Sequence, residues 1–222
     1  MSKPEYFTRH FDLIPAEAYD KKIIVVGAGA IGSFTVLSLA KMGYRNIHVY
    51  DFDTIEPENI SSQFYPTNRV GVLKVVALKE MIWNFTGIAV AMVPEAVTPE
   101  TKLSCDILIS AVDSMSVRKM LFEIANCHYL IDPRMGAEYA SMNTVTMKNR
   151  AERENYAKSL FSDAEAVQER CTAKTTIYTV FLIAGQVMKA VKDITTGSEP
   201  ISSLDWSIKH NALVAFSNGR KL

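Results

Sequence analysis

The sequence has few cysteines and no pattern of metal ligands. Three cysteines, Cys105, Cys127 and Cys171, are scattered along 222 residues, and no Cys-x-x-Cys pair occurs. An odd and unclustered set is typical of reduced thiols, and without paired cysteines we expect no structural zinc site. The four histidines also lack the spacing of metal ligands or of a catalytic triad. We therefore expect neither a disulfide scaffold nor a zinc protein.

Long apolar runs and an excess of one charge are absent as well. Residues 1–15 lack the apolar run of a signal peptide, and no stretch is long enough to cross a bilayer. Basic and acidic residues number 24 each, so no long-range attraction to nucleic acid or anionic lipid is expected. With 48% hydrophobic residues, the chain has enough apolar side chains for a substantial core. We expect a cytoplasmic protein in which residues 1–222 form one domain, with neither a membrane nor a nucleic acid as partner.

Short β-rich segments alternate with helical ones over the first 136 residues. Strands are predicted for residues 21–29, 46–53, 88–97, 105–113 and 128–136, and helices for residues 30–43, 71–86 and 116–127. This alternation is typical of a parallel sheet with helices on both faces. The expected fold class is therefore α/β, a doubly wound Rossmann-like sheet with mixed strands after the parallel core.

The pattern changes after Gly136. Residues 138–149 predict a strand, and residues 149–174 are polar and rich in charge, which indicates a mobile, partly helical crossover segment. The apolar run from about Thr175 to Val191 predicts a buried helix. The tail, residues 203–222, is expected to add one edge strand.

A glycine-rich turn joins the first predicted strand to the first predicted helix. Gly27, Gly29 and Gly32 form a G-x-G-x-x-G motif there, where backbone N–H groups and the helix dipole can hold a phosphate. Asp51 ends the next strand, where a carboxylate can accept hydrogen bonds from a ribose. A tight turn that merely needs glycine is the other interpretation, and these residues by themselves do not separate NAD from ATP.

The segment after Asp51 separates the two nucleotides. It is a polar loop, rich in acids and amides, that runs into Lys74 at the start of a helix. A bound triphosphate needs cationic and amide donors beyond the adenosine, whereas NAD enzymes have no evident need for such a loop. The loop therefore favours ATP.

The ordered combination of these motifs resembles the ThiF/MoeB-type adenylyltransferases, the superfamily that includes the ubiquitin-activating enzymes. The resemblance covers roughly residues 9–148 and is far more specific than any single motif. The matching positions are Gly27, Gly29, Gly32, Asp51, Asp53, Asn59, Gln63, Gly71, Lys74 and Asp113.

The resemblance implies an enzyme that uses ATP and Mg²⁺ to adenylate a carboxylate and releases pyrophosphate. It implies that the carboxylate is the Gly-Gly tail of a ubiquitin-like or sulfur-carrier protein, and that the enzyme is a homodimer. Lys74 would contact phosphate, Asp113 would hold the Mg²⁺, and Arg9 would reach the partner subunit's ATP. Asp51, Asp53, Asn59 and Gln63 would bind the nucleotide with the glycine loop.

Each of these residues also has an ordinary structural interpretation. Lys74 fits a solvated lysine on a first helical turn, and Asp113 fits the N-cap of the helix that follows it. Asn59 and Gln63 fit polar loop residues, and Arg9 fits an arginine in a frayed terminus. Arg118 matches a family arginine after the metal-binding Asp, but it equally fits a solvated helical residue.

One residue departs from the family pattern. Ser62 stands where most relatives carry an arginine directly before the glutamine, so a bidentate phosphate donor is missing. Arg69, seven residues further on, is the candidate to contact the same phosphates in place of the missing arginine. The departure puts the efficiency of adenylation in question.

The cysteines bear on the subfamily. Cys171, in "ERCTAKTT", resembles the thioester-forming cysteine of ubiquitin-activating enzymes, and flanking Arg170 and Lys174 favour a nucleophilic thiolate. An inert cysteine at a segment boundary is the alternative. Cys105 and Cys127 adjoin apolar strands and are expected in the core.

Three other functions stay open at this point. The carboxylate can belong to a small molecule, a peptide or a tRNA-linked substrate. The chain can be an NAD-dependent oxidoreductase, for which Lys74 and Asp113 would be dispensable. It can also be a catalytically degenerate nucleotide-binding subunit, which Ser62 makes conceivable.

Overall fold

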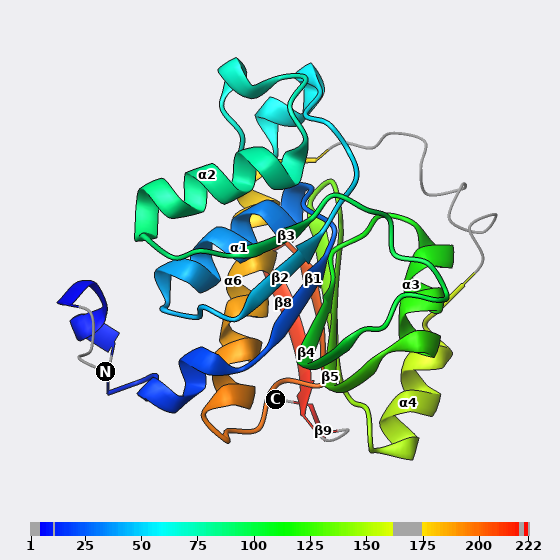
Figure 1. The fold of residues 1–222 in the computed structure, drawn as a ribbon. Helices are drawn as coiled ribbons and strands as arrows, with labels where there is room; N and C mark the ends of the chain where they lie inside the picture. The colour runs from blue at the N-terminus through cyan, green and yellow to red at the C-terminus, as the bar shows by residue number, and fades with distance from the viewer. Residues whose placement is uncertain (1–4, 11, 162–174, 218–219, 222) are drawn as a thin grey trace.

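The computed structural model describes residues 5–10, 12–161, 175–217 and 220–221. These residues form a nine-stranded sheet in the order β3-β2-β1-β4-β5-β6-β7-β8-β9 (Figure 1). The first five strands pair in parallel, and every pairing from β5–β6 onward is antiparallel. The strands are β1 (Ile23–Val26), β2 (Ile47–Tyr50), β3 (Ala91–Val93), β4 (Ser104–Ser110), β5 (Asn126–Gly136), β6 (Tyr139–Thr146), β7 (Ser203–Ser207), β8 (Ala212–Ser217) and β9 (Arg220–Lys221).

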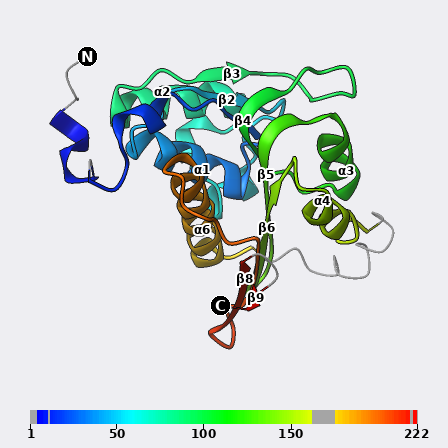
Figure 2. The ribbon, with the colours of Figure 1, turned by 90° about the horizontal axis from the view of Figure 1, so that it is seen from below.

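Helices cover both faces of the parallel part of the sheet (Figure 2). The helices are α1 (Ala30–Lys41), α2 (Lys74–Thr86), α3 (Met115–Ile124), α4 (Arg150–Ala157) and α6 (Ile177–Thr195), with short 3-10 turns at Glu5–His10, Ala16–Asp20, Pro57–Ser61 and Thr67–Arg69. Val25 and Ile107 point into a core shared with α1, α2 and α6, whereas Ile24 and Leu108 pack against α3 and α4. Because successive side chains of a strand point to opposite faces, each strand contributes residues to the core on both sides of the sheet. The expected doubly wound α/β class is confirmed. In the described part of the chain, no helix combines the length and apolar character that crossing a membrane requires.

Local signals set several helix ends. Ser114 caps α3 by accepting a hydrogen bond from the backbone N–H of Val117 at 3.4 Å. Asn149 caps α4 through bonds from Ala151 and Glu152. Helix α2 ends at Gly87, whose φ of 68° is the left-handed conformation that glycine adopts at low cost.

The C-terminal tail differs from its prediction. One edge strand was expected, but the tail forms β7, β8 and β9, and β7 pairs with β6. The turn between β7 and β8 contains neither glycine nor proline and uses Asn211 at a φ of 49°. Because that turn signal is weak, the sequence pattern does not divide the tail into strands.

The predicted crossover, residues 149–174, begins with a helix. Its first turns form α4, and Tyr156 of this helix packs into the core between the sheet and α3. Residues 162–174, and Cys171 with them, lie outside the described residues. Cys105 and Cys127 face each other across β4 and β5, half-buried and buried, as expected for core residues.

Candidate nucleotide-binding site

The candidate site lies at the carboxyl edge of the parallel strands. Val26 pairs with Tyr50 of β2 and with Ser110 of β4, so the three central strands end at one level. Strand β1 leads into α1 on one face of the sheet, whereas β4 leads into α3 on the other. Open α/β sheets bind ligands at such a switch point, just beyond the strand ends.

The three glycines at this edge differ in what a side chain at their position would contact. Gly27 has a φ of 98°, and a Cβ there would lie 2.4 Å from the carbonyl oxygen of Ala111. A Cβ on Gly32 would lie 1.9 Å from the carbonyl oxygen of Gly27. Gly29 is different, because the nearest atom to its Cβ position is Nε2 of Gln63 at 4.0 Å. The packing therefore requires Gly27 and Gly32, whereas Gly29 leaves open space at the N-terminus of α1, which is the kind of position where backbone N–H groups can hold a phosphate.

Asp51 braces the glycine loop from the neighbouring strand. Its Oδ2 accepts a hydrogen bond from the backbone N–H of Ala28 at 2.6 Å, and its Oδ1 accepts one from Asp53 at 2.8 Å. Burial raises the pKa of the Asp51 carboxyl, and the two backbone donors oppose that rise only in part. Each carboxylate oxygen retains a lone pair, so a ribose hydroxyl can still bind.

Lys74 is not a solvated helical lysine. Its Nζ lies 2.7 Å from Oδ2 of Asp53, and only 9% of its side chain is exposed. Its backbone N–H also donates to the carbonyl oxygen of Asp53, at 2.9 Å. The ammonium is thus held at the same edge as the glycine loop, where it can meet a phosphate as a point charge.

The two amide residues of the loop differ. Asn59 Oδ1 accepts a hydrogen bond from the backbone N–H of Glu56 at 3.0 Å and closes a capping box on the 3-10 turn Pro57–Ser61. This contact gives Asn59 a local structural role. Gln63 Oε1, in contrast, is buried without a hydrogen-bond partner, and its amide faces Gly29. A buried polar atom without a partner is costly, and the other end of the same amide, Nε2, is the atom that a ligand at the glycine loop would meet.

Asp113 is exposed just beyond β4 and does not cap α3, because Ser114 takes that position. Nearby Arg118 is buried rather than solvated, and one of its Nη atoms donates to the carbonyl oxygen of Val112. In the described residues, no three His, Cys, Asp or Glu side chains gather into a metal cage. A single carboxylate at a phosphate site suits Mg²⁺, which takes its other ligands from phosphates and water.

Arg9 lies away from this edge. It is exposed, two residues from Phe7, whose ring centroid is 6.3 Å from that of Tyr19. The Tyr19 ring in turn lies 2.9 Å from the position of a Cβ on Gly43, just past the end of α1. Since α1 spans about 18 Å, Arg9 sits roughly one helix length from the glycine loop of its own chain.

Ser62 and Arg69 both lie in the segment between β2 and α2. Ser62 is buried at the end of the 3-10 turn. The guanidinium of Arg69 lies 2.5 Å from a carboxylate oxygen of Glu80 on α2. Arg69 is therefore engaged on the helix and does not replace the missing arginine in this arrangement.

Sequence reasoning missed a buried ionic group behind Asp113. Residues 128–136 were predicted only as a strand, yet Asp132 within it is fully buried and paired with Arg118 and Arg134. The available signal was a pair of opposite charges, Asp132 and Arg134, inside an otherwise apolar strand, since charges are rarely buried unless paired.

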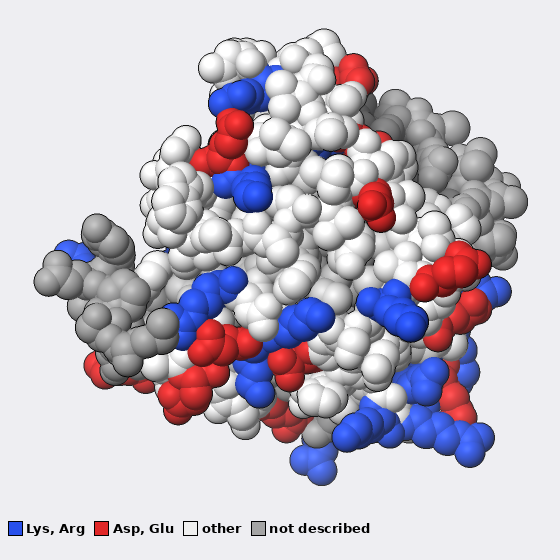
Figure 3. Space-filling model, in the orientation of Figure 1, with Lys and Arg blue, Asp and Glu red and all other residues white. Residues whose placement is uncertain are grey.

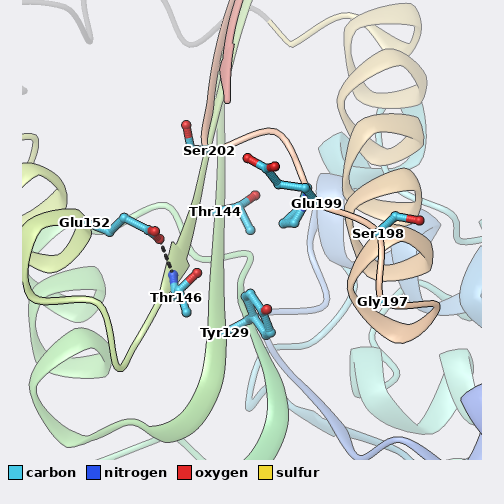
Figure 4. A pocket seen from close by; sticks show the side chains of 9 residues that line it. Tyr129, Thr144, Thr146, Glu152, Gly197, Ser198, Glu199 and Ser202 are labelled. Atoms are coloured by element: carbon cyan, nitrogen blue, oxygen red, sulfur yellow. Dashed lines mark hydrogen bonds between the residues drawn. The ribbon is translucent and has the colours of Figure 1, made fainter. Parts of the chain in front are cut away.

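A hollow lies at the amino ends of the parallel strands, opposite the candidate site. It has a volume of about 230 Å³, and Figure 4 shows Tyr129, Thr144 and Glu199 along it. Tyr129 stands near the start of β5, far from the carboxyl end of that strand. On the face drawn in Figure 3, basic and acidic side chains are interspersed, in keeping with their equal numbers.

The fold and the carboxyl edge define a Rossmann-type α/β protein with a glycine loop of the nucleotide-binding kind. The model of the ThiF family matches residues 15–212, and the chain belongs to this E1-like adenylating family.

Two curated proteins and one solved structure illustrate what this chain is similar to. SUMO-activating enzyme subunit uba-2 of Caenorhabditis elegans is 28% identical over 135 residues, which are 56% of this chain and 23% of that protein. The NEDD8-activating enzyme E1 catalytic subunit of Arabidopsis thaliana is 33% identical over 116 residues, 49% of this chain and 25% of that protein. The matches thus span about a quarter of these curated relatives. A crystal structure of E. coli MccB with ATP has a TM-score of 0.77 at 18% identity, covering 98% of this chain and 73% of MccB.

Proposed function

We propose that this chain is an ATP- and Mg²⁺-dependent adenylyltransferase that activates the C-terminal carboxylate of a ubiquitin-like or sulfur-carrier protein. The observation that carries the proposal is the buried Lys74 ammonium, paired with Asp53 beside the open glycine loop. Gln63 supports it, because its Nε2 faces Gly29, where a bound nucleotide would accept a hydrogen bond from it. Membership of the ThiF family supports the adenylation chemistry over an NAD-dependent reaction.

The chemistry requires two anions to approach each other. An oxygen of the substrate carboxylate attacks the α-phosphorus of ATP, the bond to the bridging oxygen breaks, and pyrophosphate leaves. The N–H groups that open α1, together with Lys74, lower the repulsion by neutralising phosphate charge. Asp51 would hold the ribose, and Asp113 would hold the Mg²⁺, which when bound would supply further positive charge at the phosphates.

A second step is proposed for Cys171. Its thiolate would attack the acyl carbon of the adenylate, forming a thioester while AMP leaves. Cys171 lies outside the described residues, so this step rests on the sequence resemblance and on the flanking Arg170 and Lys174.

We also propose that the enzyme is a homodimer. Four aromatic rings form a stripe that connects α2, α1 and α6. In order along the stripe they are Phe85, Phe64, Phe34 and Phe181, and the centroids of successive rings are 6.0, 5.1 and 4.7 Å apart. Phe85 and Phe181, at its ends, are 56% and 58% exposed. Phe34, in the middle, is buried, so the two exposed end rings are the part of the stripe that a partner subunit would cover. The distance of Arg9 from its own site agrees with a role in the partner's site.

One alternative acceptor has an observation in its favour. MccB, described as a microcin C7 biosynthetic enzyme and solved in complex with N-formylated MccA, shares the fold of 97% of this chain. That likeness favours, as the second candidate, a carboxylate on a peptide or small substrate rather than on a ubiquitin-like protein.

The test is carboxylate-dependent exchange between ATP and pyrophosphate, with Gly-Gly-tailed proteins, peptides and small acids as acceptors. We expect exchange with wild type, its loss in Lys74→Ala and Asp113→Ala, and its survival in Cys171→Ala. Exchange with peptides or small acids alone would move the acceptor to the second candidate. ATP binding without exchange for any acceptor would leave a degenerate nucleotide-binding subunit, and binding of NAD in preference to ATP would overturn the proposal.

A further inference from the structure

A buried ionic network lies directly behind the loop that carries Asp113. Asp132 of β5 has no exposed surface, and its Oδ1 accepts a hydrogen bond from Arg118 of α3. Its Oδ2 accepts hydrogen bonds from Nε of Arg134 at 2.7 Å and from the hydroxyl of Tyr156 at 3.0 Å. One buried carboxylate therefore orients donors from α3, β5 and α4.

The two arginines extend from this carboxylate to two different segments. Arg118 donates from its other Nη to the carbonyl oxygen of Val112, the residue before Asp113. Arg134 donates from Nη1 to the carbonyl oxygen of Ser159 at 2.9 Å and from Nη2 to its hydroxyl at 3.1 Å. One arm thus holds the loop between β4 and α3, and the other holds the chain just after α4.

The contact with Val112 acts on Asp113 through the peptide bond. The carbonyl of Val112 and the nitrogen and Cα of Asp113 lie in one plane, so holding the carbonyl orients the start of Asp113. Arg118 is itself restrained, because a buried guanidinium has few alternatives once its fork is bonded to both Asp132 and Val112. The carboxylate of Asp113, in contrast, is exposed, and its position depends on the backbone that carries it.

We propose that Arg118, oriented by Asp132, is the positioning residue for the Mg²⁺ ligand Asp113. The proposal rests on the proposed function, since it takes Asp113 as the carboxylate that meets the metal of bound ATP. Mutating a residue that orients a metal ligand typically lowers metal affinity or activity about 10- to 100-fold. Arg118 thereby sets how well the nucleotide's metal is held without touching the metal or the nucleotide.

The decisive variant is Arg118→Lys, with Tyr156→Phe as its matched control. A lysine keeps a positive charge beside Asp132, but its single ammonium replaces the planar fork that bonds Asp132 and Val112 together. Tyr156→Phe removes a hydrogen bond from the same carboxylate and leaves the Val112 contact in place. If Arg118→Lys does not fold, Arg118→Met replaces it, because Asp132 then keeps Arg134 as a charge partner.

Three measurements are made on each protein, two with divalent metal and one, the affinity for a non-hydrolysable ATP analogue, without it. The first is Mn²⁺ binding by electron paramagnetic resonance with a non-hydrolysable ATP analogue, and the second is the Mg²⁺ concentration that gives half-maximal exchange. In the Arg118 variant we expect the dissociation constant for Mn²⁺ and the half-maximal Mg²⁺ concentration each to rise about 10- to 100-fold, because the metal is held more weakly. The affinity for the analogue without divalent metal stays at the wild-type value, and the Tyr156→Phe protein matches wild type in all three measurements.

Equal metal affinity in the Arg118 variant and in wild type would overturn the positioning role, as would equal losses in the Arg118 and Tyr156 variants. Failure of the proposed function has a different signature. A wild type that binds Mn²⁺ with the analogue but shows no exchange is not an adenylyltransferase, and the Mn²⁺ affinities then decide the role of Arg118 by themselves.

Discussion

The ammonium of Lys74 lies 2.7 Å from the carboxylate of Asp53, buried on the lysine side and 48% exposed on the aspartate side. We predict that Lys74→Met retains the fold, because methionine replaces the apolar stem and Asp53 can be hydrated. Its free energy of unfolding should change by no more than about 1 kcal/mol. ATP–pyrophosphate exchange should fall at least about 100-fold, because the phosphate loses its point charge. Lys79→Met, an exposed lysine on the same helix, is the control, and equal losses in the two variants would contradict the role of Lys74.

Gly27→Ala is expected to destabilise the protein by more than about 3 kcal/mol, since it adds strain at a φ of 98° and a methyl group 2.4 Å from a backbone oxygen. Gly87→Ala is the control for conformation without contact, because Gly87 also has a positive φ but no atom lies within 4 Å of its Cβ position. That change should cost only about 1–2 kcal/mol. Urea unfolding at neutral pH compares the two, and similar losses would refute the packing explanation.

Gln63→Met should separate stability from nucleotide binding. Removing the partnerless buried oxygen of Gln63 should stabilise the nucleotide-free protein by about 1 kcal/mol. Loss of the amide should weaken ATP binding about 10-fold. Calorimetric titration and thermal unfolding measure the two effects. Asn59→Ala, which removes the cap acceptor at Glu56, should only destabilise, by about 1 kcal/mol. Unchanged ATP affinity in Gln63→Met would remove Gln63 from the site.

The raised pKa of Asp51 predicts opposite pH trends for ATP affinity and for the free energy of unfolding. Burial raises the pKa of Asp51 above its ordinary value of 3.8. As the pH falls through the raised value, the protonated carboxyl accepts fewer hydrogen bonds, so ATP affinity decreases. Over the same range the folded state binds more protons than the unfolded state, so the contribution of Asp51 to stability rises as the pH falls.

The substitution Asp51→Asn isolates this effect, and Asp20 provides a comparison. Asp51→Asn should bind ATP weakly and lack this pH-dependent step, and the wild-type gain in stability on acidification should shrink. Asp20 has the opposite sign, because a hydrogen bond from Arg45 lowers its pKa, and its contribution is lost as the pH falls through that value. Urea unfolding and fluorescent-nucleotide titration from pH 7.5 downward measure both trends. Parallel losses of affinity in wild type and Asp51→Asn would exclude Asp51 as the titrating group.

Phe181→Glu should convert a dimer into a monomer by placing a charge in the aromatic stripe. Leu213→Glu changes an exposed apolar residue of β8, outside the stripe, and should leave the dimer intact. Light scattering after gel filtration distinguishes the two. A dimeric Phe181→Glu protein would place the interface elsewhere.

Arg9 provides a test of the composite site. Arg9→Ala and Lys74→Met should each be inactive as homodimers, because each removes a phosphate contact from both sites. Mixing and exchanging subunits should restore part of the exchange activity, since one site of the mixed dimer contains both residues. No recovery after verified subunit exchange would show that Arg9 does not act across the interface.

Local signals explain which parts of the fold could be predicted. The apolar run before Gly27 and the glycines after it predict a strand, a turn and a helix, because each depends on neighbouring residues. The three-stranded tail could not be divided in the same way, since its turn at Asn211 lacks glycine and proline. Strand β3 is also shorter than its apolar run suggested, because it lies at the edge of the sheet.

The candidate site was predictable where a motif has a fixed spacing and not where partners meet through the fold. The sequence by itself determined the family, the glycine loop and the set of candidate residues, because these follow from the order and spacing of residues along the chain. The tertiary structure alone decided that Lys74 is buried against Asp53, that Ser114 rather than Asp113 caps α3, and that Asp132 joins two arginines. Burial and pairing depend on what the rest of the chain packs around a residue, and no local pattern contains that information.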